Sequence, residues 1–240
     1  MSSKRVSGEP AFVLHTYAYK ETSLIVELFT RTHGRVGVLA KGARRPKSSQ
    51  RSVLNLFQPI VVGWGGRGDL KTLYEADWRP GGKVPPGSTL ISGYYLNELL
   101  LKLMMREDPH EDLFDAYEKI VFDFSSNDVH VEKSLRRFEK FLLQELGYGL
   151  DLMTDAKTHT QVDQNALYTY IIGRGPVKIS ETAKVEVKLL GRVLMDIAND
   201  KYEDASTLSQ SKQLMRFVIN HYLGNKSLHT RKLILDLQAT

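Results

Sequence analysis

The stretch Ser23-Leu-Ile-Val-Glu-Leu-Phe-Thr-Arg-Thr-His-Gly-Arg-Val-Gly-Val-Leu-Ala-Lys41 decides the fold, because it contains two strand-like runs joined by a turn. Both runs are rich in β-branched and apolar residues, and the Thr-His-Gly between them is typical of a turn. The complete set of strand-like runs is 12–17, 23–30, 35–41, 57–63 and 70–78. Five short strands in so short a stretch favour a small barrel or sandwich, and we predict a five-stranded OB-fold barrel over residues 1–80.

Within residues 35–41 the side chains separate into two faces. Val36, Val38 and Ala40 point one way, whereas Arg35, Gly37, Leu39 and Lys41 point the other way, because successive side chains alternate. A glycine inside a strand often marks a place where another backbone comes close. The second face is therefore either a cationic binding surface or an ordinary solvated exterior.

The sequence has no acidic residue between Glu27 and Asp69, although it has eight cationic ones. These are Arg31, Arg35, Lys41, Arg44, Arg45, Lys47, Arg51 and Arg67. Protein surfaces normally mix charges of both signs, so we interpret this stretch as a surface without counter-charges that meets an anion, nucleic acid above all. Residues 1–80 hold thirteen Lys or Arg and six Asp or Glu, whereas residues 81–240 have a slight acidic excess. This asymmetry indicates two functionally different parts.

Residues 41–51 carry five of these cations, interrupted by Gly42 and Pro46, and we expect them to form a loop rather than a helix. Flexible cations can follow a phosphate backbone without reading base sequence, although a mobile solvated loop is the alternative. The candidate DNA-binding residues are Arg35, Lys41, Arg44, Arg45, Lys47, Arg51 and Arg67. Some of the many aromatic residues in this part could stack on unpaired bases, but most at alternating strand positions should be core.

Residues 63–68 fit the pattern G-x-G-x-x-G and follow a predicted strand. A dinucleotide-binding motif also requires a helix after the glycines, but the residues that follow alternate as in a strand. We therefore interpret this stretch as a glycine-rich hairpin connection with Arg67 at its tip.

Residues 81–240 are predicted to form a mainly α-helical domain, which makes the chain an α+β protein. Residues 80–87 read as a linker rich in proline and glycine. Expected helices cover 88–106, 111–124, 129–146, 181–199 and 206–223, with a short helix from about Thr230. A small insertion at about 150–180 should hold a β-hairpin with strands at 166–172 and 176–179.

Within the helix expected at 129–146, Leu135, Phe138 and Leu142 form an apolar stripe flanked by Arg136 and Arg137. Arginine beside an apolar groove can receive an acidic peptide or a terminal carboxylate. An amphipathic helix with solvated arginines is the alternative.

Several kinds of chemistry lack their sequence signals. The chain has no cysteine, no Walker-type phosphate loop, no histidine pair at metal-binding spacing and no G-x-S-x-G. We expect no cofactor, no metal site and no enzymatic activity. No apolar signal core or membrane-spanning run is apparent, which suggests a soluble cytoplasmic protein. A metal-dependent nuclease with a dispersed site and a protein-only scaffold are the competing hypotheses.

Short motifs in order along the chain resemble the RecO family of bacterial recombination mediators. They are Ala11-Phe-Val-Leu-His15, Glu21-Thr-Ser-Leu24, Gly34-Arg35, Ala40-Lys-Gly-Ala-Arg44, Gly65-Gly-Arg-Gly68, Lys71-Thr-Leu73, Tyr95-Leu-Asn-Glu-Leu-Leu100, Leu135-Arg-Arg-Phe-Glu139 and Leu146-Gly-Tyr-Gly149. They are densest from residue 11 to residue 149, and together they are specific although no single one is.

The resemblance implies a DNA-repair protein with an N-terminal OB domain and a helical C-terminal domain. Such proteins bind single- and double-stranded DNA, anneal complementary strands without ATP, and with RecR help RecA to displace the single-stranded-DNA-binding protein SSB. The family's DNA-binding region matches Arg35, Lys41, Arg44 and Arg45. In some members an arginine contacts the acidic SSB tail, and Arg136 matches the position of that arginine. The resemblance therefore favours a groove for an acidic peptide that also involves Arg137 and Leu142. A bacterial, nucleoid-associated location is also implied.

The chain departs from many relatives in one respect. Those relatives have a four-cysteine zinc module in the region that corresponds to residues 150–180, whereas this chain has no cysteine. It therefore resembles a zinc-free branch, in which the small hairpin must hold without metal.

Overall fold

The computed structural model describes residues 5–81, 84–126, 130–224 and 226–231. It contains two compact units. The barrel unit comprises residues 1–129 together with 228–240, and the hairpin unit comprises residues 130–227.

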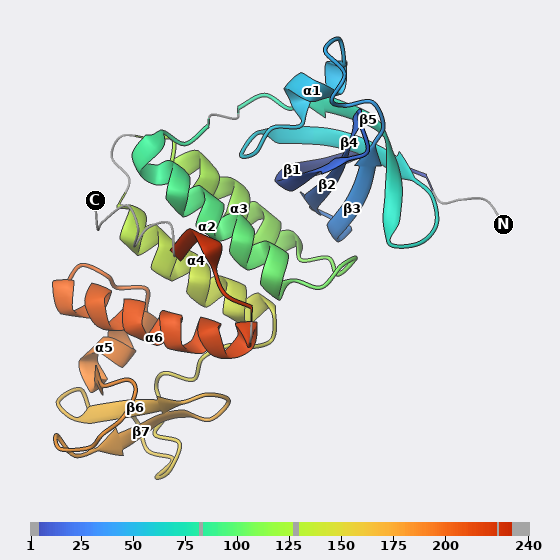
Figure 1. Cartoon of the computed structure of the whole chain (residues 1–240). Coiled ribbons are helices and arrows are strands. Elements are labelled where there is room, and N and C mark those ends of the chain that lie inside the picture. Colours follow the sequence, from blue (N-terminus) through green and yellow to red (C-terminus); the bar gives the residue numbers. More distant parts are fainter. Residues whose placement is uncertain (1–4, 82–83, 127–129, 225, 232–240) are drawn as a thin grey trace. The chain divides into compact units, whose positions relative to one another are not determined.

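The barrel unit begins with a closed five-stranded barrel (Figure 1). Its strands are β1 (Val6–Tyr19), β2 (Ser23–Thr30), β3 (Gly34–Ala40), β4 (Pro59–Gly65) and β5 (Leu70–Trp78). The order around the barrel is β1-β2-β3-β5-β4, with β3 and β5 parallel and the other neighbours antiparallel. This is the expected OB-fold barrel.

Alternation along the strands fills the barrel interior as predicted. Val36, Val38 and Ala40 all lie in the buried core, where they meet Val26 and Leu28 of β2. The strand-like runs were predicted because this alternation is a local property, and four of the five begin within two residues of the observed strands. The run at 12–17 is the exception, since β1 extends it by six residues towards the N-terminus.

Strand direction gives the barrel two distinct ends. The β1–β2 end carries the turn 20–22 and the connection from β3 to β4, because β1 and β3 finish there. The β2–β3 end carries the turn 31–33 and the β4–β5 connection at 66–69. Gly63–Gly68 thus covers the end of β4 and the start of the hairpin connection to β5, and a strand rather than a helix follows, which confirms that the glycine pattern is not a dinucleotide-binding motif.

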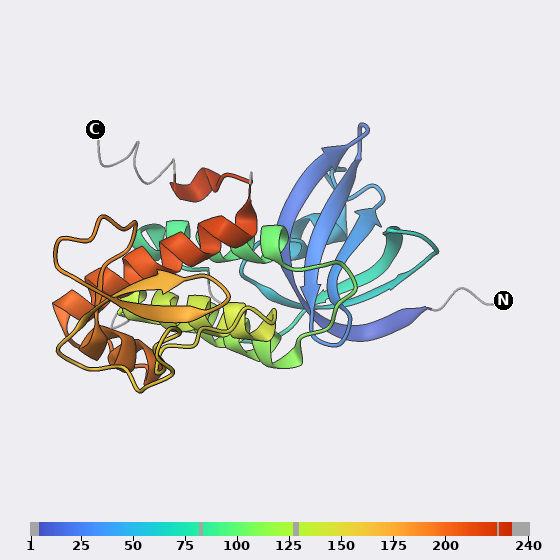
Figure 2. The ribbon, with the colours of Figure 1, turned by 90° about the horizontal axis from the view of Figure 1, so that it is seen from below.

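Helices α2 (Gly87–Leu103) and α3 (Glu111–Asp123) complete the barrel unit and lie to one side of the barrel in both views (Figures 1 and 2). Phe12 of β1 and Phe29 of β2 pack their rings on Phe114 and Tyr117 of α3, with centroids 5.1–5.8 Å apart. The outer faces of β1 and β2 are therefore partly covered by helices, and the unit extends beyond residue 80.

The hairpin unit contains three helices and a small sheet among its described residues. The helices are α4 (Val131–Glu145), α5 (Gly191–Ala198) and α6 (Ala205–Leu223). Strands β6 (Leu167–Ile171), β7 (Gly175–Ile179) and β8 (Leu189–Leu190) form a sheet in the order β7-β6-β8, which includes the predicted hairpin. Asp204 caps the start of α6 by accepting bonds from the amides of Ser206 and Thr207.

A buried carboxylate organises the residues beside this hairpin. Asp155 Oδ1 accepts hydrogen bonds from the amides of Lys157 (2.8 Å) and Thr158 (3.0 Å), and Oδ2 accepts one from Lys178 of β7 (3.0 Å). Burial acts to raise the pKa of Asp155, but the amide donors outweigh it and the pKa is lowered. The carboxylate thereby ties the loop before β6 to β7.

Two expected elements differ from the structure, and a third is described only in part. Residues 181–188 are not helical, because Leu189 and Leu190 pair with Tyr168 and Leu167 of β6 and only then does α5 begin. The end of the loop expected at 41–51 belongs to a short helix, α1 (Ser49–Val53), which turns Val53 into the barrel core. The helix expected from Thr230 lies mostly outside the described residues, of which 229–231 are helical.

Candidate nucleic-acid interface

Residues 41–51, here called the basic loop, are fixed to the β1–β2 end of the barrel. The amide of Arg44 donates to the carbonyl of Thr22 (2.8 Å), and its guanidinium Nη1 donates to the carbonyl of Lys20 (3.2 Å). Ala43 is fully buried in the barrel core. The basic loop is therefore a folded connection that packs on the β1–β2 turn, rather than a free tether.

The cations of the basic loop project into solvent. Lys41, Arg44, Arg45, Lys47 and Arg51 are all exposed, and none forms an ion pair with any residue that the structure describes. An excess of unneutralised positive charge on one side of a small barrel attracts polyanions.

Lys20 extends this positive surface and was missed in the sequence. It lies exposed in the β1–β2 turn with a left-handed backbone, and its ammonium lies 5.5 Å from the centre of the Tyr19 ring. Glu21, also exposed, is the acidic residue of the same turn. Lys20 lies before Glu27 and thus outside the acid-free stretch, but its position directly after a strand is a signal that the sequence contains.

Two other cations of the acid-free stretch have counter-charges after all. The guanidinium of Arg31 bonds both carboxylate oxygens of Asp115 in α3, at 3.2 and 2.8 Å. Arg35 Nη1 bonds Glu27 Oε2 at 2.9 Å. The interpretation that this stretch lacks counter-charges is thus wrong for Arg31 and Arg35, because folding brings in carboxylates from a neighbouring strand and a helix.

Arg35 is part of an ionic cluster around the buried carboxylate of Glu27. Glu27 is only 4% exposed, and its two oxygens contact Arg35 and Arg106, while Arg35 also donates to the carbonyl of Met104. A Cβ atom at Gly37 would lie 3.2 Å from the guanidinium of Arg106. The glycine on this face therefore makes room for a side chain of the segment after α2, rather than for another backbone.

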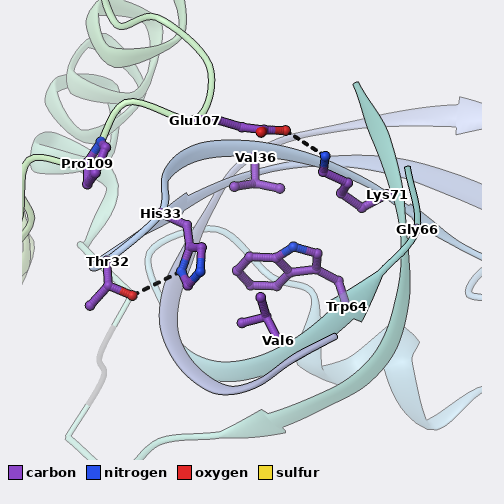
Figure 3. A pocket seen from close by; sticks show the side chains of 9 residues that line it. All are labelled: Val6, Thr32, His33, Val36, Trp64, Gly66, Lys71, Glu107 and Pro109. Carbon is purple, nitrogen blue, oxygen red and sulfur yellow. Dashed lines mark hydrogen bonds and ion pairs between the residues drawn. The ribbon is translucent and has the colours of Figure 1, made fainter. Parts of the chain in front are cut away.

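Arg67 lies at the opposite end of the barrel from the basic loop, since it belongs to the β4–β5 connection. Next to it is a pocket of about 320 Å³ (Figure 3). His33 meets the Trp64 ring edge to face at 5.2 Å, and Lys71 pairs with Glu107 at 2.8 Å. Tertiary structure thus divides the seven candidate DNA-binding residues into the basic loop, the half-buried Arg35 that is paired with Glu27, and the distant Arg67.

The three candidate residues of α4 differ from one another in burial and in their partners. Arg136 is 7% exposed and bonds Glu139 at 2.8 Å, and Leu142 is fully buried. Arg137 is exposed, donates to the carbonyl of Asp200 and lies over the Tyr202 ring at 5.8 Å. The Nε of Arg136 and the hydroxyl of Tyr202 are buried without a hydrogen-bond partner in the described part of the chain.

The described residues contain no group of three or more His, Asp or Glu side chains that could hold a metal ion. None of their helices combines the length and the apolar character needed to cross a membrane.

A closed OB barrel with an unneutralised basic loop at one end and helices packed on its flank defines a class of nucleic-acid-binding protein. Comparisons with known proteins give the particular family. The family described as "Recombination protein O N terminal" matches residues 5–80, and "Recombination protein O C terminal" matches residues 87–232.

Full-length relatives agree with this assignment. The DNA repair protein RecO of Aromatoleum aromaticum is 47% identical over 239 residues, which cover 99% of both chains. That of Nitrosospira multiformis is 45% identical over 99% of this chain and 98% of its own. That of Dechloromonas aromatica is 43% identical, with 98% and 97% covered. The chain belongs to the RecO family, and its biological role is DNA repair.

Proposed function

We propose that this protein binds single- and double-stranded DNA through the basic loop and anneals complementary strands without catalysis of its own. The proposal rests on the group of exposed cations at the β1–β2 end of the barrel, which form no ion pair with any of the described residues. Lys41, Arg44, Arg45, Lys47 and Arg51 can each reach a phosphate, and such contacts carry no sequence information.

Annealing follows from charge neutralisation. Two complementary strands repel each other through their phosphates, and this repulsion falls when cations of one surface hold both. The anchoring of the basic loop through Ala43 and Arg44 keeps these cations together on one surface. The protein thus raises the local concentration of both strands and lowers their repulsion.

The decisive experiment reverses charge in the basic loop. If four phosphates of a single strand are engaged, the slope of log affinity against log salt should be roughly −3, from about −0.7 per phosphate. The variant Lys41→Glu/Arg44→Glu/Lys47→Glu should lose annealing and most of its DNA affinity. Arg35 is left unchanged because it belongs to the ionic cluster around Glu27.

A matched control carries the same change of net charge in the hairpin unit. Lys157→Glu/Arg174→Glu/Lys184→Glu alters three exposed cations there and should keep annealing largely intact. Wild-type DNA affinity in the basic-loop variant, with its fold preserved by circular dichroism, would refute the assignment.

Two other classes of function make different predictions. A metal-dependent nuclease would cut labelled DNA in the presence of Mg²⁺ or Mn²⁺, whereas we expect the strands to be recovered uncut. A protein-only scaffold would show no DNA binding even at low salt, where phosphate contacts are strongest.

We further propose that the protein acts with RecR to load RecA onto SSB-coated strands and that α4 contacts the acidic SSB tail. Family membership supports this, as does the buried Nε of Arg136, which has no hydrogen-bond partner among the described residues. Arg136→Ala and Arg137→Ala should each weaken the binding of an SSB tail peptide, measured by calorimetry, while the affinity for DNA stays unchanged. Equal peptide affinity in wild type and both variants would remove this site, and annealing of SSB-coated oligonucleotides with and without RecR tests the wider role.

A further inference from the structure

The outer face of β1, β2 and β3 is divided into a covered and an open half. Towards the β2–β3 end, Phe12 and Phe29 lie under α3, and Glu27 lies under the segment after α2. Towards the β1–β2 end, the register places Tyr17, Ile25 and Leu39 in one row across the three strands. Tyr17 is 48% exposed, so the row is open to solvent at this point.

Alternation fixes which side chains share this open half. A bulge after Val13 brings His15 and Tyr17 onto the outer face of β1, and their rings meet edge to face at 4.4 Å. His15 therefore supports one edge of the Tyr17 ring. Lys41 follows directly after β3, two residues beyond Leu39, and is exposed at this end of the barrel.

The positive charge of the basic loop borders this open half directly. Lys20 follows β1 within three residues of Tyr17, and Arg44 is bonded to the carbonyl of Lys20. A solvent-exposed aromatic ring beside cations that have no ion pairs among the described residues matches the two components of a single-strand site, a stacking platform and a phosphate track.

We propose that Tyr17 is a stacking platform for an unpaired base of a DNA strand whose phosphates lie on Lys41 and the basic loop. This inference rests on the proposed DNA binding and adds a selectivity to it. Duplex bases are already stacked on each other, so the ring of Tyr17 can contribute only to single strands. Tyr17 on the outer face of the barrel then distinguishes unpaired from paired DNA, whereas the cations of the basic loop bind both.

Charge complementarity argues for a nucleic acid rather than a protein on this surface. A peptide seated on Tyr17, Ile25 and Leu39 would have to be acidic to lie next to Lys20, Lys41 and Arg44. A polyanion with flat apolar bases satisfies the ring and the cations at once, and stacking tolerates any base because each has a π-face.

The test compares an oligothymidylate of about 15 nucleotides with the same length of abasic tetrahydrofuran phosphodiester, measured by fluorescence anisotropy. Both carry equal charge, so the difference in affinity reports base contacts alone. Wild type should prefer thymidylate by about fivefold or more, since one stacked base supplies a free energy of that order. Tyr17→Leu should bring the two affinities close together while duplex affinity stays unchanged, and Tyr17→Phe should restore the preference.

Tyr74→Leu serves as the control, because Tyr74 of β5 is also an exposed barrel tyrosine (53%) but lies over Gly65 next to the opposite end. It should keep the wild-type preference. The inference is overturned if wild type binds both ligands equally, or if Tyr17→Leu retains the preference, as it would if Tyr17 served only a protein partner. Failure of wild type to bind either ligand would instead overturn the proposed DNA binding itself.

Discussion

Replacement of Arg35 by glutamine should destabilise the barrel unit and leave its DNA-binding mode intact. Arg35 Nη1 bonds Glu27 Oε2 at 2.9 Å, and its Nε and Nη2 donate to the carbonyl of Met104 at 3.3 and 3.2 Å. The side chain thus joins β2 and β3 to the end of α2. Three of the five N–H donors of the guanidinium are committed to these bonds, and the side chain is only 15% exposed, so it offers far less to a phosphate than an exposed cation of the basic loop does.

The size of the effect follows from the burial of Glu27. Loss of one partner of a buried ion pair costs 3–5 kcal/mol, because the remaining charge is left in a poorly solvated place. Arg106 still contacts Glu27 in the variant, so we expect the lower end, about 3 kcal/mol. For a unit of this size that corresponds to a fall of roughly 9 °C in the melting temperature.

The assay pairs thermal unfolding with the salt dependence of DNA binding below the melting transition. Arg35→Gln should lower the melting temperature and keep the wild-type salt slope. Lys41→Gln, at an exposed position directly after β3, should keep the melting temperature and reduce the magnitude of the slope by about 0.7. An Arg35→Gln protein that melts like wild type but loses one phosphate contact would refute this reasoning and return Arg35 to the DNA interface.

Two carboxylates give further predictions. Burial opposes ionisation of Glu98, but donors from Lys102, Thr230 and His229 lower its pKa to about 2, so its contribution to stability is complete above about pH 4.5 and is lost as the pH falls towards 2. Melting temperatures of wild type and Glu98→Gln should accordingly differ at pH 6 and converge as the pH falls towards 2; a constant difference would contradict this. Asp155→Ala removes the acceptor of three backbone amides and should cost the hairpin unit about 2–4 kcal/mol, measured by urea unfolding, with Asp163→Ala as the milder exposed control.

Local signals in the sequence were sufficient to predict most of the strands and helices. Val36, Val38 and Ala40 alternate with polar or small neighbours, and the Thr32-His33-Gly34 turn separates two runs, so strand β3 and its inward face could be predicted. The prediction of a helix over 181–199 was wrong for its first half. Leu189 and Leu190 pair with β6, and no local periodicity reveals this pairing. The cations of residues 41–51 could be identified from the sequence, because charge is a property of each residue. The anchoring of this loop through Ala43 could not, because it depends on packing in the barrel core.

The sequence by itself determined the OB barrel, the family and the presence of an excess of cations in the first eighty residues, because strand period, turn residues and charge are properties of neighbouring residues. Only the tertiary structure decided which cations act together. The register of β2 and β3 and the packing of α2 and α3 neutralise Arg35 and Arg31, and strand direction places Arg67 at the far end. Charges interact through space rather than along the chain, so their partners depend on contacts that are distant in sequence.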